Sequence, residues 1–292
     1  MDTIETIKRS DARYPKLLAQ IADPPEQLYC RGNINLFSKT CLAIVGTRKI
    51  TPYGREAATT IARELAYSGF TIVSGLALGI DATAHAATLD AHGNTIAVLG
   101  SGADDDHIGP PTNLPLAHRI LKDGGLIVSE YPPGTPGYKD QFPARNRIIS
   151  GLSLGVLVVE ADSKSGALIT ARCALEQNRD VFAVPGSIFS PRSAGTNHLL
   201  QQGAKAVLTA NDILSEYDAQ STLFTTEQKN LSTRNPVEQQ ILAILESNGP
   251  TILDEIIRKT DSDTPTVIAA LSMLEIHGRV KQISPGTYHL CN

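Results

Sequence analysis

The fold is decided by residues 41–81, which read CLAIVGTRKITPYGREAATTIARELAYSGFTIVSGLALGID. The apolar run Cys41–Val45 has the near-continuous hydrophobic character of a parallel strand that is covered on both faces. Residues 54–68 follow with apolar side chains at helical spacing, and residues 71–73 form a second apolar run. A strand, a helix and a second strand in this order predict a βαβ unit.

The same alternation continues along the chain and stops near Tyr217. Further apolar runs lie at 95–99, 126–128, 155–159, 180–184 and 206–208, with helical patterns at 80–92, 114–122, 144–152, 167–178 and 197–202. We therefore expect an α/β domain over residues 40–216: an extended, Rossmann-like, doubly wound and mostly parallel sheet. Residues 1–39 are expected to form a short N-terminal extension, with short helices and turns over 14–36.

The last part of the chain has a different pattern. Residues 217–234 are polar and are expected to form a linker. Residues 235–292 carry three helical patterns and a Pro-Gly turn between two short strands, which predicts a small winged-helix domain. Residues 234–292 hold five Lys or Arg against seven Asp or Glu, a formal charge of −2, and the third helix (265–277) has no Lys or Arg. This favours a protein contact or a weak auxiliary nucleic-acid role over sequence-specific DNA recognition.

Composition limits the classes of function. The 292 residues contain 26 Lys and Arg against 30 Asp and Glu, a net charge of −4, so nucleic-acid binding through general basicity is excluded. Four Cys without a C-x-x-C pair argue against a structural zinc or a redox dithiol, and we expect no metal and no cofactor. Without an apolar run of about 20 residues or a leader-like start, we expect a cytoplasmic protein with no membrane partner.

Small, flexible and hydrogen-bonding residues follow most of the predicted strands. Carboxyl ends of parallel strands lie at one edge of a sheet, where ligands bind in open α/β folds. Several Gly-rich turns entering helices at that edge predict a site for phosphates. No G-x-G-x-x-G lies in a βα turn and no Walker Lys is present, which disfavours a standard nucleotide site. The residues assigned to the site here are Gly46, Thr47, Arg48, Lys49, Ser74, Gly75, Gly79, Gly100, Ser101, Ser165, Gly166, Gly186, Ser187, Thr196 and Asn197.

A second group of candidates lies in residues 139–147. Lys139, Phe142, Arg145, Asn146 and Arg147 interleave cations with an aromatic ring. Such a pattern suits single-stranded nucleic acid, since cations follow the phosphates while a ring stacks on a base. The alternative is a helix start with solvated Arg side chains.

Acid–base candidates are weaker. Asp81 and His85 lie at positions i and i+4 of a predicted helix, a spacing that suits a metal ion or an acid–base pair. No third metal ligand is apparent, and helix capping by Asp81 with a hydrogen-bonded His85 is favoured. The run Asp104–His107 is taken as a solvated acidic loop. No catalytic residue is therefore assigned. Two alternatives remain: an enzyme acting on a small nucleotide, with Asp81 and His85 or Glu130 as acid–base groups, and a regulator that uses the winged helix.

Five motifs together resemble one family. They are GTR at 46–48, SGLALGIDATAH at 74–85, FPARNRIISGL at 142–152, SGALITA at 165–171 and GTNHLLQQGA at 195–204. In this order they are similar to the DprA/Smf family of DNA-processing proteins of natural transformation. The resemblance implies a homodimer that binds single-stranded DNA without sequence preference and loads the RecA recombinase onto incoming strands. It also implies that Arg48, Lys139, Arg145 and Asn146 take the places of the family's DNA-binding residues.

A related branch, the LOG-type phosphoribohydrolases, carries a Pro-Gly-Gly-x-Gly-Thr-x-x-Glu loop. This chain has Pro185-Gly186-Ser187, a longer spacing to Gly195-Thr196, and Leu199 where that pattern has Glu. Without this Glu, a binding protein is favoured over a nucleotide hydrolase. The nucleotide hydrolase remains the alternative function.

Overall fold

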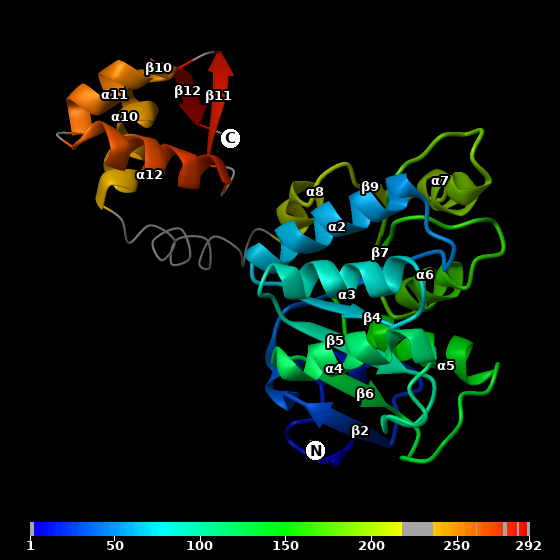
Figure 1. Cartoon of the computed structure of the whole chain (residues 1–292). Coiled ribbons are helices and arrows are strands. Elements are labelled where there is room, and N and C mark those ends of the chain that lie inside the picture. The colour runs from blue at the N-terminus through cyan, green and yellow to red at the C-terminus, as the bar shows by residue number, and fades with distance from the viewer. Residues whose placement is uncertain (1–2, 218–235, 261, 277–278, 285, 291–292) are drawn as a thin grey trace. The chain divides into compact units, whose positions relative to one another are not determined.

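The computed structural model describes residues 3–217, 236–260, 262–276, 279–284 and 286–290 (Figure 1). The chain divides into two compact units, Met1–Ser221 and Thr222–Asn292. Apart from Tyr217, the predicted linker over residues 217–234 lies outside the described residues.

The first unit is built on a nine-stranded sheet. All neighbours from β6 to β9 are parallel, whereas β1 and β2 extend the sheet antiparallel beyond β6. The strands in sheet order are β1 (Glu5–Lys8), β2 (Gln27–Gly32), β6 (Leu126–Ser129), β5 (Thr95–Leu99), β4 (Thr71–Ser74), β3 (Cys41–Val45), β7 (Gly155–Val158), β8 (Asp180–Ala183) and β9 (Lys205–Ala206).

Helices cover both faces of the sheet. Successive side chains of a strand point to opposite faces, so Leu42 and Ile44 of β3 join the core beneath α2 and α3, while Ala43 and Val45 join the core beneath α5 and α6. The helical elements of this unit are α1 (Lys16–Ala19), η1 (Ile34–Ser38), α2 (Pro52–Tyr67), α3 (Ile80–Asp90), η2 (Pro111–Asn113), α4 (Leu114–Lys122), α5 (Gln141–Gly151), α6 (Ala167–Glu176), η3 (Pro191–Ser193), α7 (Ala194–Gln201), α8 (Asn211–Leu214) and η4 (Ser215–Tyr217).

Strand order reverses at the centre of the sheet. From β3 the chain first adds β4, β5 and β6 on one side, and then returns to add β7, β8 and β9 on the other. The doubly wound α/β fold expected from the sequence is thereby confirmed. At such a switch point the loops that follow β3 and β7 diverge, and a crevice opens between them.

The expectation for the N-terminal segment was partly wrong. The short helix α1 and the turn η1 are present, but residues 27–32 form β2, which pairs with both β1 and β6. Leu28 and Cys30 of this strand are buried, and Tyr29 and Arg31 between them are only partly so. The first 32 residues thus contribute two strands to the main sheet.

The second unit is a small helical domain with a three-stranded sheet of order β10-β12-β11, and it confirms the expected winged helix. Its core includes Ile241, Leu245, Ile256, Leu271 and Leu274. Its elements are α10 (Pro236–Asn248), β10 (Thr251–Ile252), α11 (Leu253–Thr260), α12 (Thr264–Ile276), β11 (Val280–Ser284) and β12 (Thr287–Leu290). Among the described residues of the whole chain, no helix is both long and apolar enough to cross a membrane.

Candidate nucleic-acid interface

A pocket of about 930 Å³ lies at the switch point, between the loops that follow β3 and β7. It is bounded further by the start of α5 and by η3. We call it the cationic pocket, because six Lys and Arg line it against two carboxylates: Arg48, Lys49, Lys139, Arg145, Lys164 and Arg192 against Asp81 and Asp162. Positive charge is thus concentrated at one place on a chain of net charge −4.

Four of these cations have no acidic partner within residues 3–217. Arg48, Lys49, Lys139 and Lys164 are exposed and form no ion pair there. The guanidinium carbon of Arg48 lies 5.9 Å from the centroid of the Phe142 ring, within cation–π range. The pocket therefore offers free positive charge beside an aromatic ring.

The loop that carries Arg48 is held by a buried acid, Glu160, which follows β7. Its carboxylate accepts a hydrogen bond from the Thr51 hydroxyl (2.6 Å) and one from the Thr51 backbone N–H (3.1 Å). Its carbonyl oxygen accepts the Thr47 N–H at 2.7 Å. The two loops at the switch point are therefore joined directly, and the position of Arg48 depends on β7.

Arg145 forms the floor of the cationic pocket. Its side chain donates hydrogen bonds to the carbonyl oxygens of Gly75 (2.8 Å) and Val98, and only 5% of the residue is exposed. Burial lowers the pKa of Arg145 to about 10, so the guanidinium stays charged at neutral pH. A Cβ on Gly75 would lie 2.5 Å from that guanidinium, which explains glycine at this position. Arg145 thus ties α5 to the ends of β4 and β5.

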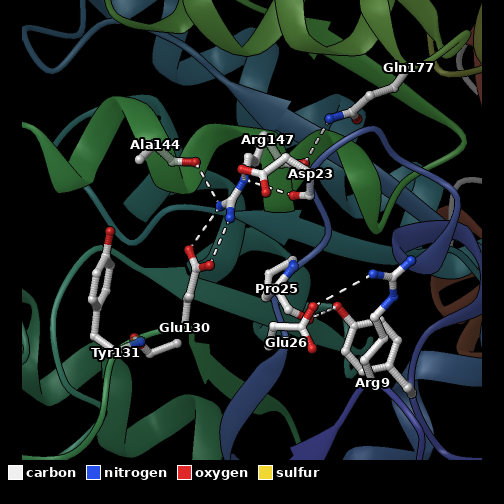
Figure 2. Close-up of polar contacts among 11 residues, drawn as sticks. Arg9, Asp23, Pro25, Glu26, Glu130, Tyr131, Ala144, Arg147 and Gln177 are labelled. Carbon is white, nitrogen blue, oxygen red and sulfur yellow. Dashed lines mark hydrogen bonds and ion pairs between the residues drawn. The ribbon is translucent and has the colours of Figure 1, made fainter.

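Arg147 points away from the pocket. Its guanidinium binds both carboxylate oxygens of Glu130 (2.7 and 2.9 Å) and reaches Asp23 at 3.1 Å (Figure 2). Because both acids lie outside α5, the side chain fastens this helix to the end of β6 and to the N-terminal segment. The contact predicted between Arg147 and DNA has no support from this geometry.

The remaining sequence candidates divide into two groups. Gly46, Thr47, Lys49, Lys139, Phe142, Asn146, Ser165 and Gly166 line the pocket together with Arg48 and Arg145. The others lie behind it or beside it. Ser74 donates a hydrogen bond to the Ile44 carbonyl, and a Cβ on Gly79 (φ +82°) would collide with the Thr47 carbonyl. The residues outside the lining are Ser74, Gly75, Gly79, Gly100, Ser101, Arg147, Gly186, Ser187, Thr196 and Asn197.

Two lining cations were missed from the sequence. Lys164 precedes the predicted pair Ser165 and Gly166, and Arg192 lies between the glycines at 186 and 195. One Arg192 Nη atom is 3.4 Å from the Thr47 hydroxyl oxygen and 4.0 Å from an Asp162 carboxylate oxygen. A positive charge inside a Gly- and Ser-rich turn was the signal that could have identified both.

Asp81 and His85 do not act on each other. Asp81 lines the pocket, accepts the Gly75 N–H at 3.1 Å, and has its pKa raised by burial. His85 is fully buried against Thr95, with 2.6 Å between Nδ1 and the hydroxyl oxygen, and burial lowers its pKa to about 3. The Thr95 hydroxyl donates to the Ile72 carbonyl, so His85 Nδ1 must carry the proton that Thr95 accepts. Within the described residues, no three His, Cys, Asp or Glu side chains are placed to hold a metal ion.

Comparisons with known proteins agree across both units. Residues 5–218 match the family model for DNA recombination-mediator protein A, and residues 225–286 match that for the DprA winged helix domain. The DNA processing protein DprA of Bacillus subtilis is 48% identical over 223 residues, covering 76% of this chain and 74% of that protein.

Two solved structures share the fold. The X-ray structure of DNA processing protein A from Streptococcus pneumoniae has a TM-score of 0.69 at 43% identity, covering 73% of this chain and 74% of that one. A structure of DNA processing protein A from Helicobacter pylori, reported for its single-stranded DNA binding mode, has a TM-score of 0.66 at 34% identity and covers 74% and 98% of the two chains.

Proposed function

The chain belongs to the DprA/Smf family of DNA recombination-mediator proteins, and from this premise we propose that it binds single-stranded DNA without sequence preference. In this proposal it protects incoming strands during natural transformation, loads the RecA recombinase onto them as a homodimer, and works in the cytoplasm. It does so as a binding protein, without catalysing a reaction on the DNA.

The observation that supports the proposal is the free charge of the cationic pocket. Arg48, Lys49, Lys139 and Lys164 gather around it without acidic partners in residues 3–217. Neutralising DNA phosphates releases condensed counterions, which drives binding whatever the base sequence. Contacts to phosphate and sugar carry no sequence information, so the same contacts serve every sequence.

The pocket favours an unpaired strand over a duplex. Its volume of about 930 Å³ is that of a small-ligand site, so single nucleotides of a flexible strand enter it and a paired helix does not. The Phe142 ring, held beside Arg48, provides a face on which an unpaired base stacks. Helix α6 begins next to Ser165 and Gly166, so the positive end of its dipole lies at the pocket and favours a phosphate.

Catalysis on a nucleotide finds less support. It would need Asp81 to share a substrate with His85 or Glu130. His85 is buried against Thr95, the Glu130 carboxylate binds Arg147, and neither residue lines the pocket. If purified protein released base from nucleoside monophosphates, and Asp81→Asn abolished that release, this alternative would replace the proposal.

The proposal is tested by comparing affinities for single-stranded and duplex oligonucleotides of equal length at several salt concentrations. We expect tighter binding of the single strand, independent of its sequence, and a linear fall of log affinity with log salt. Equal or tighter binding of the duplex would contradict the proposal.

A further inference from the structure

The loop between β8 and α7 displays two adjacent apolar side chains. Phe189 is 90% exposed and Ile188 is 83% exposed, the highest values for large apolar residues in the described part of the chain. Scattered apolar side chains on a surface are common. Two neighbours that both remain outside the core are less so, and they suggest that this loop meets a ligand.

Hydrogen bonds at its base hold the loop in place. The Tyr53 hydroxyl donates to the Pro185 carbonyl at 2.6 Å. The side-chain amide of Asn197 donates to the Gly186 carbonyl (3.0 Å) and accepts the Gly186 N–H (3.2 Å). Nearer the tip, the Phe189 N–H donates to the Ser187 hydroxyl oxygen at 3.3 Å. The exposed ring therefore stands on a loop that is tied to both α2 and α7.

The same loop runs directly into the cationic pocket. Pro191 and Arg192 belong to the lining, and Arg192 reaches the Thr47 hydroxyl on the far loop. Phe189 precedes Arg192 by three residues, so their Cα atoms are at most about 11 Å apart. Tyr53, 49% exposed, lies at the base of the loop. Phe142 therefore lies beside Arg48, while Phe189 is three residues from a different lining cation, Arg192.

We propose that Phe189, with Ile188 beside it, is a second base-stacking platform for the strand that leaves the cationic pocket. This inference rests on the proposed single-strand binding and extends its site by the loop at 184–193. Proteins that hold single strands alternate cations for the phosphates with rings for the bases. Here Phe142 would stack one base near Arg48, and Phe189 another beyond Arg192.

The size of the patch favours a nucleobase over a protein partner. An aromatic side chain buries roughly 150–250 Å², so Phe189 and Ile188 together fall short of the roughly 800 Å² that each partner buries in a stable protein interface. A single base covers one ring face. The neighbouring cation, Arg192, also complements a phosphate.

The absence of tryptophan from this sequence gives a direct test. Phe189→Trp puts the only tryptophan at the proposed platform, where its emission can be excited selectively over that of tyrosine. Tyr67→Trp puts the only tryptophan at an exposed aromatic position at the end of α2, away from the pocket lining. We expect a dT oligonucleotide to quench the first and leave the second unchanged. Unchanged emission at position 189 under saturating oligonucleotide would overturn the inference.

Affinity gives an independent readout. Stacking one base is worth about 5- to 150-fold in affinity, so Phe189→Ala should weaken dT binding by that factor and leave the salt slope unchanged. The loss should shrink on an abasic strand. Wild-type affinity in Phe189→Ala, or a changed oligomeric state of that variant without DNA, would refute the platform. If wild-type protein itself did not bind the oligonucleotide, the proposed function would fail instead.

Discussion

Arg48 has its guanidinium beside Phe142 and no acidic partner in residues 3–217, so replacing it removes free charge from the cationic pocket. We expect Arg48→Ala to weaken single-strand binding and to reduce the slope of log affinity against log salt by about 0.7, because one phosphate is no longer neutralised. Arg63→Ala is the matched control, because Arg63 is exposed on α2 outside the pocket lining. Equal salt slopes for the two variants would contradict this role.

The burial of His85 predicts how the free energy of unfolding depends on pH. Burial holds its native pKa at about 3, below the ordinary 6.5, so only the unfolded chain binds a proton between these values. The stability due to neutral His85 is complete above pH 6.5 and is lost as pH falls. Between pH 6.5 and 5 the free energy of unfolding should drop by about 2 kcal/mol from this residue.

Denaturant unfolding of wild type and His85→Asn over that pH range isolates the effect. The Asn side chain keeps a donor for Thr95 but does not titrate. The raised pKa of Asp81 acts in the opposite direction and is common to both proteins. Parallel pH dependences for the two proteins would show that His85 is not buried in its neutral form.

At this scale the sequence identified residue types better than their partners. The places of Arg48 and Lys139 in the pocket lining could be predicted, because Arg48 closely follows a predicted strand and Lys139 precedes a predicted helix near the same sheet edge. Arg147 looked the same in sequence, but its partners, Asp23 and Glu130, are 124 and 17 residues away in the chain. Whether a cationic side chain forms an ion pair depends on residues that are distant in the chain, so it can be read only from the folded structure.

At the scale of elements, α5 is positioned by Arg147. The bidentate pair with Glu130 and the contact with Asp23 join this helix to β6 and to the N-terminal segment (Figure 2). We expect Arg147→Ala to lower the free energy of unfolding by about 1–3 kcal/mol, because the pair is only partly exposed and one carboxylate loses its partner. Chemical denaturation measures this decrease.

The same variant is also tested by the salt dependence of its DNA binding. A folded Arg147→Ala protein should keep the wild-type salt slope, because the guanidinium does not line the cationic pocket. If Arg147→Ala reduced the slope of log affinity against log salt as Arg48→Ala does, and left stability unchanged, Arg147 would contact DNA and this assignment would be wrong.

The elements show why β2 escaped prediction while β3 to β8 did not. A central parallel strand is apolar along its length, as Cys41–Val45 is, and the run is visible in the sequence alone. β2 buries only alternate residues over a few positions, and it pairs with β6 about a hundred residues later. Its pairing is non-local, and a short alternating pattern is a weak signal.

At the scale of the whole molecule, the chain has two units with separate cores, Met1–Ser221 and Thr222–Asn292. The cationic pocket belongs entirely to the first unit, and α12 of the second carries no Lys or Arg. We therefore expect a protein ending at Ser221 to bind single strands within about threefold of the full chain. Loss of all DNA binding on this truncation, measured by gel shift, would favour a winged-helix regulator.

The reversal of strand order also determines at what stage of synthesis the cationic pocket can be completed. The walls of the pocket come from loops as far apart in the chain as Gly46 and Arg192. A polypeptide still emerging from the ribosome, or cut short by a premature stop codon in the first half of its gene, brings out Arg48 without the opposite wall. In the proposed function, single-strand binding therefore becomes possible only after Arg192 has been synthesised, and we expect fragments that end before Arg192 not to bind.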